Sequence, residues 1–132
     1  MIPANIKQRP WWLFPVLPWG AWVTLSPNIY YPKGTDPARF PNVIAHERVH
    51  LQEQAGGLCT WLLHYLTSRS YRLDMEARAY AAEAGVCRAM GDALLAESTI
   101  TSAAQALASW QYGWAASSVA QAESLIRSYL EA

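Results

Sequence analysis

The pattern of hydrophobic and polar positions changes once along the chain, near Pro41. Before it, the runs AWVTL (21–25) and NIYYP (28–32) are β-branched and aromatic, with Ser26 and Pro27 between them. Such residues favour strands, so we expect one bent strand or a small β-hairpin. The following KGTDPARFP (33–41) is typical of turns.

After Pro41 the pattern becomes helical. Asn42 can cap a first helix that runs to about Ala55 and stops at Gly56-Gly57. TSRS (67–70) ends a second helix. The apolar residues of this second helix recur with the 3.6-residue period at Leu58, Trp61, Leu62, Tyr65 and Leu66.

Three more helices are expected towards the C-terminus. Ser70 can cap one over residues 71–90, and Asp92 can cap another that is bent near STITS (98–102). A last helix follows Gly113. Its apolar face consists of Ala115, Val119, Ala122, Ile126 and Tyr129.

These elements predict a mostly α, compact helical domain spanning residues 1–132. An irregular aromatic segment (1–20) comes first, a core (21–90) carries the strand element and three helices, and C-terminal helices (91–132) are rich in Ala and Ser.

The N-terminal segment is rich in tryptophan. We expect it to wrap around the body and pack its indoles; a patch for a protein partner or a membrane surface is the second interpretation. Prolines and a glycine interrupt the apolar stretch 11–25, which argues against a transmembrane span and a signal peptide. The tryptophans concerned are Trp11, Trp12, Trp19 and Trp22.

Composition narrows the function classes. Ten basic residues balance ten acidic ones, so no nucleic-acid partner is expected. Charged residues make up 15% and hydrophobic ones 52%, as in a globular chain. Cys59 and Cys87 are expected to be reduced, buried thiols, with a single disulfide as the alternative.

Candidate chemistry lies in His46-Glu47-Arg48-Val49-His50, which uses two of the three histidines. Residues four apart on a helix differ by about 40° around its axis, so the two imidazoles project side by side. They can share one Zn²⁺, and Glu47 between them can deprotonate a metal-bound water.

A third ligand is expected from a later helix. An extended histidine motif is excluded, because Glu53 and Gly56 stand where it needs glycine and histidine. Glu76 falls inside the apolar stripe of the third helix, where a carboxylate is costly unless it is paired or binds a metal. Glu83 is the alternative ligand. An ion pair of Glu76 with Arg72 or Arg48 is the alternative without a metal.

Other polar residues have less defined roles. Glu53 can hold a histidine or an arginine, or be a solvated charge. His64 lies off the apolar stripe of its helix and is expected to be a surface or packing histidine and not a ligand. Cysteine ligands would require a mixed site. Tyr65, Tyr71 and Tyr80 are candidate oxyanion donors, and packing in the core or at the surface is the alternative for each of them. Tyr80 lies one turn beyond Glu76 on its face.

The segments IYYP, VIAHERVHLQEQ and YRLDMEARAY, within residues 22–82, resemble the small gluzincin-type metallopeptidases called minigluzincins. In that family a short edge strand precedes the active-site helix, and similar small proteins occur in bacteria and bacteriophages. The resemblance implies His46, His50 and Glu76 as zinc ligands and Glu47 as general base. The chain departs from larger gluzincins at Tyr80, where they often have an acidic residue, and in its few strands.

We therefore expect a zinc-dependent peptidase acting on peptide or protein substrates, in the cytoplasm or a phage particle. The alternative is a zinc-containing structural or assembly protein, such as a virion component, that docks to partners through its aromatic N-terminus and helical tail. A metal-free helical interaction module is the third hypothesis.

Overall fold

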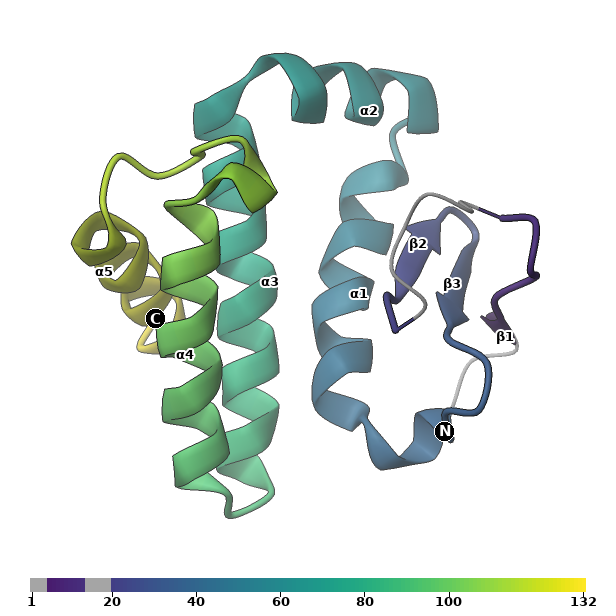
Figure 1. Ribbon diagram of the computed structural model, residues 1–132, viewed down its shortest axis with the longest axis horizontal. Coiled ribbons are helices and arrows are strands. Elements are labelled where there is room, and N and C mark those ends of the chain that lie inside the picture. Colours follow the sequence, from purple (N-terminus) through teal and green to yellow (C-terminus); the bar gives the residue numbers. More distant parts are fainter. Residues whose placement is uncertain (1–4, 14–19) are drawn as a thin grey trace.

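The computed structural model describes residues 5–13 and 20–132, in which five α-helices accompany one small sheet (Figure 1). The mostly α prediction is confirmed. The elements are β1 (Ile6–Gln8), β2 (Val23–Leu25), β3 (Asn28–Tyr31), α1 (Pro41–Gln54), α2 (Leu58–Thr67), α3 (Arg69–Ala89), α4 (Ala93–Leu107) and α5 (Val119–Leu130), with 3-10 turns at Pro37–Arg39 and Trp110–Tyr112.

The sheet has the strand order β1-β3-β2. β2 and β3 form a hairpin, one of the two arrangements expected, with Thr24 opposite Ile29. β1 pairs parallel to β3, which places Ile6 on the other side of Ile29. The sequence analysis missed β1, because three residues are too few to show an alternation of hydrophobic and polar side chains.

Helix α1 lies between the sheet and α3 (Figure 1). α2 crosses one end of the molecule, so α3 returns antiparallel beside α1. α3 contacts four other helices, α1, α2, α4 and α5. Its buried face is rich in alanine, including Ala77, Ala81 and Ala84, and these small side chains let the neighbouring backbones approach closely.

The buried side chain of Gln54 joins the end of α1 to the hairpin. Its Oε1 accepts from the Ser26 amide at 2.7 Å, and its Nε2 donates to the Thr24 carbonyl at 2.9 Å. Both polar ends of the amide are therefore satisfied. This interaction fixes β2 relative to α1.

Several predicted helix boundaries were wrong. Asn42 does not cap α1; the helix begins at Pro41, a favoured first position, and Asn42 is buried inside it. Ser68, not Ser70, caps α3 by accepting from the Tyr71 amide, whereas Asp92 caps α4 as predicted. α4 continues as one helix through 98–102.

The last helix begins later than predicted. Ser118 caps α5, so Ala115 precedes the helix, although Ala122 and Ile126 of the predicted face are buried. The α2 stripe is only partly covered. Trp61 and Tyr65 are half-buried, but Leu62 and Leu66 are exposed, because α2 packs on its neighbours along one edge only.

The N-terminal indoles do not all pack as expected. Trp11 and Trp12, in a turn after β1, are 87% and 60% exposed, so the wrapping interpretation is wrong for both. Trp22 does pack, against the rings of Tyr31 and Phe40. Trp19 lies outside the described residues.

Two further expectations concern the cysteines and the membrane. Cys59 and Cys87 are both free thiols, but only Cys87 is buried as predicted; Cys59 lies on the exposed side of α2. Among the helices of the described residues, none has the length and hydropathy needed to cross a membrane.

Replacing Gln54 by Ala should lower the free energy of unfolding by about 2–4 kcal/mol, because it leaves the partly buried Ser26 amide and the buried Thr24 carbonyl without partners. Urea denaturation followed by circular dichroism would measure the change. The exposed neighbour Gln52 provides the control, and Gln52→Ala should cost less than about 0.5 kcal/mol. Equal effects of the two substitutions would contradict the role given to Gln54.

Candidate metal centre

Two imidazoles meet on the face of α1 that points to α3. His46 is buried and His50 is half-buried, one turn apart as their spacing predicts. The Nε2 atoms of the two rings are 3.1 Å apart. Both rings therefore direct the same nitrogen to one point.

Glu76 of α3 comes to that point from the opposite side. Its Oε2 lies 3.5 Å from each histidine Nε2. Two atoms that bind a tetrahedral zinc ion at about 2.0–2.1 Å lie about 3.3 Å apart, so the three observed separations fit the edges of such a site. Within the described residues, this triad is the group of side chains that can hold a metal ion.

One oxygen of the Glu76 carboxylate lacks a hydrogen bond. Its buried Oε2 has no hydrogen-bond partner among the described residues, whereas its Oε1 accepts from the Tyr65 hydroxyl at 2.9 Å. Buried polar atoms normally have a partner. A donor set of two imidazoles and one carboxylate, with an unpaired oxygen at its centre, fits Zn²⁺.

The electrostatics of the cluster also favour positive charge. Burial lowers the pKa of His46, but its close contacts with Glu76 and Glu83 and the charge of Glu47 outweigh burial and raise the pKa to about 10. Burial likewise opposes ionisation of Glu76, yet the charge of His50 and the close contacts with both imidazoles hold the pKa of Glu76 well below the usual range. In the absence of a metal, a proton on His46 supplies part of this charge.

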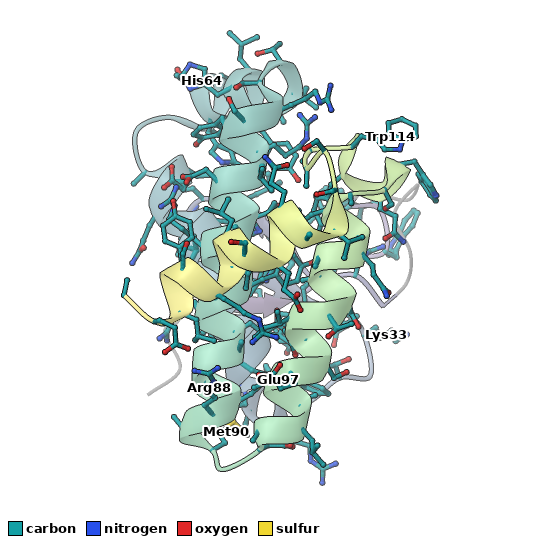
Figure 2. The ribbon with its side chains drawn as sticks, turned by 90° about the vertical axis from the view of Figure 1, so that its left-hand side faces the viewer. Lys33, His64, Arg88, Met90, Glu97 and Trp114 are labelled. Atoms are coloured by element: carbon teal, nitrogen blue, oxygen red, sulfur yellow. The ribbon has the colours of Figure 1, made fainter. Side chains whose placement is uncertain are left out.

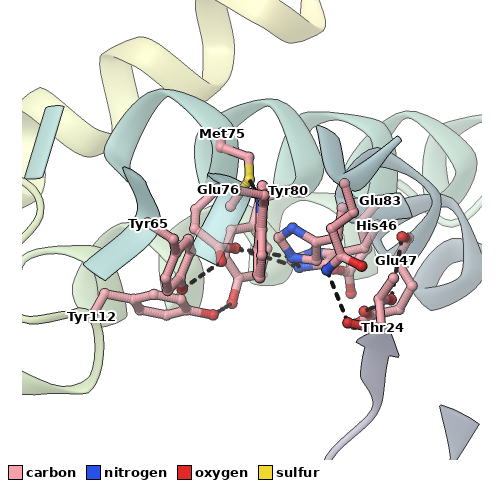
Figure 3. Close-up of polar contacts among 12 residues, drawn as sticks. Thr24, His46, Glu47, Tyr65, Met75, Glu76, Tyr80, Glu83 and Tyr112 are labelled. Atoms are coloured by element: carbon pink, nitrogen blue, oxygen red, sulfur yellow. Dashed lines mark hydrogen bonds and ion pairs between the residues drawn. The ribbon is translucent and has the colours of Figure 1, made fainter. Parts of the chain in front are cut away.

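Glu83 is not at the triad but behind it. Its Oε2 lies 3.0 Å from His46 Nδ1, the ring nitrogen opposite the one that faces His50 (Figure 3). A carboxylate in this place fixes the tautomer and orientation of a metal-binding histidine. Of the two glutamates considered from the sequence, the structure thus brings Glu76 to the imidazoles and gives Glu83 a supporting contact.

The Glu47 carboxylate is held by the sheet. Thr24 of β2 donates its hydroxyl to Glu47 Oε2 at 2.6 Å, and both side chains are buried (Figure 3). This bond engages one carboxylate oxygen and leaves the other for a second partner. The sequence analysis missed Thr24, whose only signal was its place in a predicted strand.

Three tyrosines line the other side of the cluster. Tyr65 donates to Glu76, and the Tyr80 ring packs edge-on against His46 at 4.4 Å between centroids. The Tyr80 and Tyr112 hydroxyls are 2.6 Å apart (Figure 3). Burial raises the pKa of all three phenols, so they remain protonated donors at neutral pH. Tyr112 was missed, since it lies 32 residues beyond Tyr80.

The buried guanidinium of Arg72 supports these tyrosines. It donates to the carbonyls of Tyr112, at 2.8 Å, and of Tyr65. Arg72 therefore satisfies backbone groups and does not form the ion pair with Glu76 considered above. Arg48 is exposed on α1.

The remaining candidates lie away from the triad. Glu53 pairs with Arg78 at 2.6 Å and accepts from Tyr71, so it holds an arginine, one of the roles considered. Burial and the contact with Glu53 raise the pKa of Tyr71 to about 12. His64 is exposed on α2, at the outer end of the molecule, as expected (Figure 2). Neither cysteine belongs to the triad.

Comparison with known proteins adds no relative: no protein-family model, curated protein or solved structure matches the chain.

Replacing Glu76 by Ala should abolish stoichiometric zinc binding, because it removes one of three ligands. Glu83→Ala should weaken zinc binding about 10–100-fold, the usual effect of losing a carboxylate that supports a ligand. Metal analysis after dialysis, and competition with a fluorescent chelator, would measure both.

The exposed Glu131 provides the matched control, and Glu131→Ala should keep full zinc affinity. The ligand assignment would be wrong if Glu76→Ala retained one zinc per chain while Glu83→Ala lost it.

Proposed function

We propose that this protein is a zinc-dependent peptidase. The observation that carries the proposal is the convergence of His46, His50 and Glu76 within metal-binding distance of one point, with a buried glutamate next to His46 in the sequence. Because gluzincins use this combination of residues, the proposal includes a gluzincin-like mechanism.

Zinc at the triad would lower the pKa of a coordinated water and polarise a substrate carbonyl. Glu47 is the general base: it takes the proton of the attacking water and passes it to the leaving amine. Thr24 holds Glu47 Oε2, so the second oxygen is the one that accepts the proton. Glu83 keeps His46 in the orientation that its ligand role needs.

Negative charge on the substrate oxygen would be stabilised by a phenol. Tyr80 is the predicted donor, and its hydroxyl pairs with that of Tyr112. Because the Tyr80 oxygen can accept from the Tyr112 hydroxyl while the Tyr80 hydroxyl donates to the substrate, Tyr112 orients Tyr80 for this task. The raised pKa values of both keep the proton available.

A zinc-containing assembly protein is the second candidate. Exposed aromatic side chains favour it: Trp11 and Trp12 lie on the turn after β1, and Trp110 and Trp114 lie between α4 and α5 (Figure 2 labels Trp114). Tryptophan is enriched in protein interfaces. In this hypothesis, zinc stabilises the packing of α1 against α3, and the exposed aromatic surface binds the partner proteins.

Replacing Glu47 by Gln should lower peptide cleavage by a factor of about 10²–10⁴, because the amide cannot accept the proton. The protein should still bind one zinc ion, since Glu47 is not a ligand. A diverse peptide library, read by mass spectrometry on zinc-loaded protein, would measure cleavage.

Glu53→Gln on the same helix is the control, and it should change the rate by less than about threefold. If the wild-type protein binds zinc and cleaves nothing in the library, the assembly hypothesis replaces the peptidase.

A further inference from the structure

A pocket of about 380 Å³, lined by both polar and small apolar side chains, lies between α3 and α4 and shares Glu83 with the surroundings of the metal centre. Its volume is at the lower end of the range for ligand sites, about 300–1,000 Å³. Small side chains on α4 make room for it. The polar groups that line it come from Tyr80, Glu83, Ser98, Thr99, Ser102 and Gln111.

The charge of this pocket has one sign. Glu83 is an acid, the other polar lining residues are neutral, and no lysine or arginine belongs to the lining. Hydroxyl and amide oxygens can all accept hydrogen bonds. The pocket therefore suits a cationic group with several N–H donors. An anionic ligand would meet the carboxylate of Glu83.

The pocket is next to the proposed reaction. Glu83 contacts His46 Nδ1 at 3.0 Å, and the Tyr80 ring packs on the same imidazole. Glu83 and Tyr80 thus line the pocket and also contact His46, whose Nε2 faces the triad. Since an extended peptide advances about 3.3–3.6 Å per residue, we expect a side chain in the pocket to belong to a residue near the scissile bond.

Glu83 can serve both His46 and a ligand. A carboxylate has about four lone-pair sites, so the bond to His46 leaves room for a second donor. The Glu83 carboxylate contacts both the pocket and a proposed zinc ligand, so substitutions of Glu83 would change ligand binding and zinc binding together. The pocket is therefore tested by substitutions on α4.

We infer that the α3–α4 pocket is a specificity site for a basic side chain, lysine or arginine, of the peptide substrate. This inference rests on the proposed peptidase function for its substrate, but the pocket's preference for a cation can be measured separately.

The first experiment measures kcat/KM of zinc-loaded protein with matched peptides that carry lysine, norleucine or glutamate within two residues of the cleaved bond. Lysine should exceed norleucine by about tenfold or more at one position, and glutamate should be poorest. Ser102→Lys places a cation in the pocket and should remove the lysine preference. Thr101→Lys, on the exposed side of α4 outside the pocket, is the control and should retain it.

The second experiment does not need cleavage. Zinc-loaded Glu47→Gln protein is titrated with the blocked tripeptides acetyl-Ala-Lys-Ala-amide, acetyl-Ala-norleucine-Ala-amide and acetyl-Ala-Glu-Ala-amide, and amide NMR shifts are followed. The lysine peptide should bind about tenfold tighter than the norleucine peptide and shift Ser98, Thr99 and Ser102. Ser102→Lys should abolish this binding.

The outcomes separate the two proposals. Binding of the lysine peptide in the pocket without cleavage of any peptide would support the pocket and overturn the peptidase. If the protein cleaves lysine and norleucine peptides equally well, and Ser102→Lys has the same effect as Thr101→Lys, the pocket is not a specificity site and the peptidase proposal stands. Absence of both lysine-selective binding and cleavage would overturn both.

Discussion

The site depends on the packing of α1 against α3. This contact brings the carboxylate of Glu76 to two imidazoles that are paired on α1, and it places Glu83 behind one of them. Glu47, Glu76 and Glu83 would repel one another in a dry interior unless positive charge lay among them. The α1–α3 interface is thus also the place in the fold where positive charge is stabilised.

The parts around this interface fix its geometry. Gln54 and Thr24 tie α1 to the small sheet, and the same threonine holds the Glu47 carboxylate. On the other side, Arg72 bonds to the carbonyls of Tyr65 and Tyr112, whose hydroxyls reach Glu76 and Tyr80. Backbone and site are therefore stabilised by the same side chains, and a change in one element alters the orientation of a functional group in another.

The sheet in this protein is small, yet it performs one specific task at the site. β2 supplies Thr24, and the pairing of β2 with β3 places Thr24 opposite the buried Ile29. A three-residue strand is sufficient for this, because Gln54 adds two hydrogen bonds from α1. The C-terminal helices have a different role: α4 covers α3 and forms one wall of the pocket beside Glu83.

The sequence alone determined the helical class, the strand-forming residues before Pro41 and the pairing of His46 with His50, because each follows from local residue preference, local periodicity or a spacing of four residues. The sequence does not decide whether the strand residues form one bent strand or a hairpin. Burial logic was enough to select Glu76, since a carboxylate in an apolar stripe needs a partner. The tertiary structure decided what depends on distant segments: the contact of Glu83 with His46, of Thr24 with Glu47, and of Tyr112 with Tyr80. It also decided that Trp11 and Trp12 are exposed, because hydrophobicity predicts a preference for burial but not which surface is available to cover an indole.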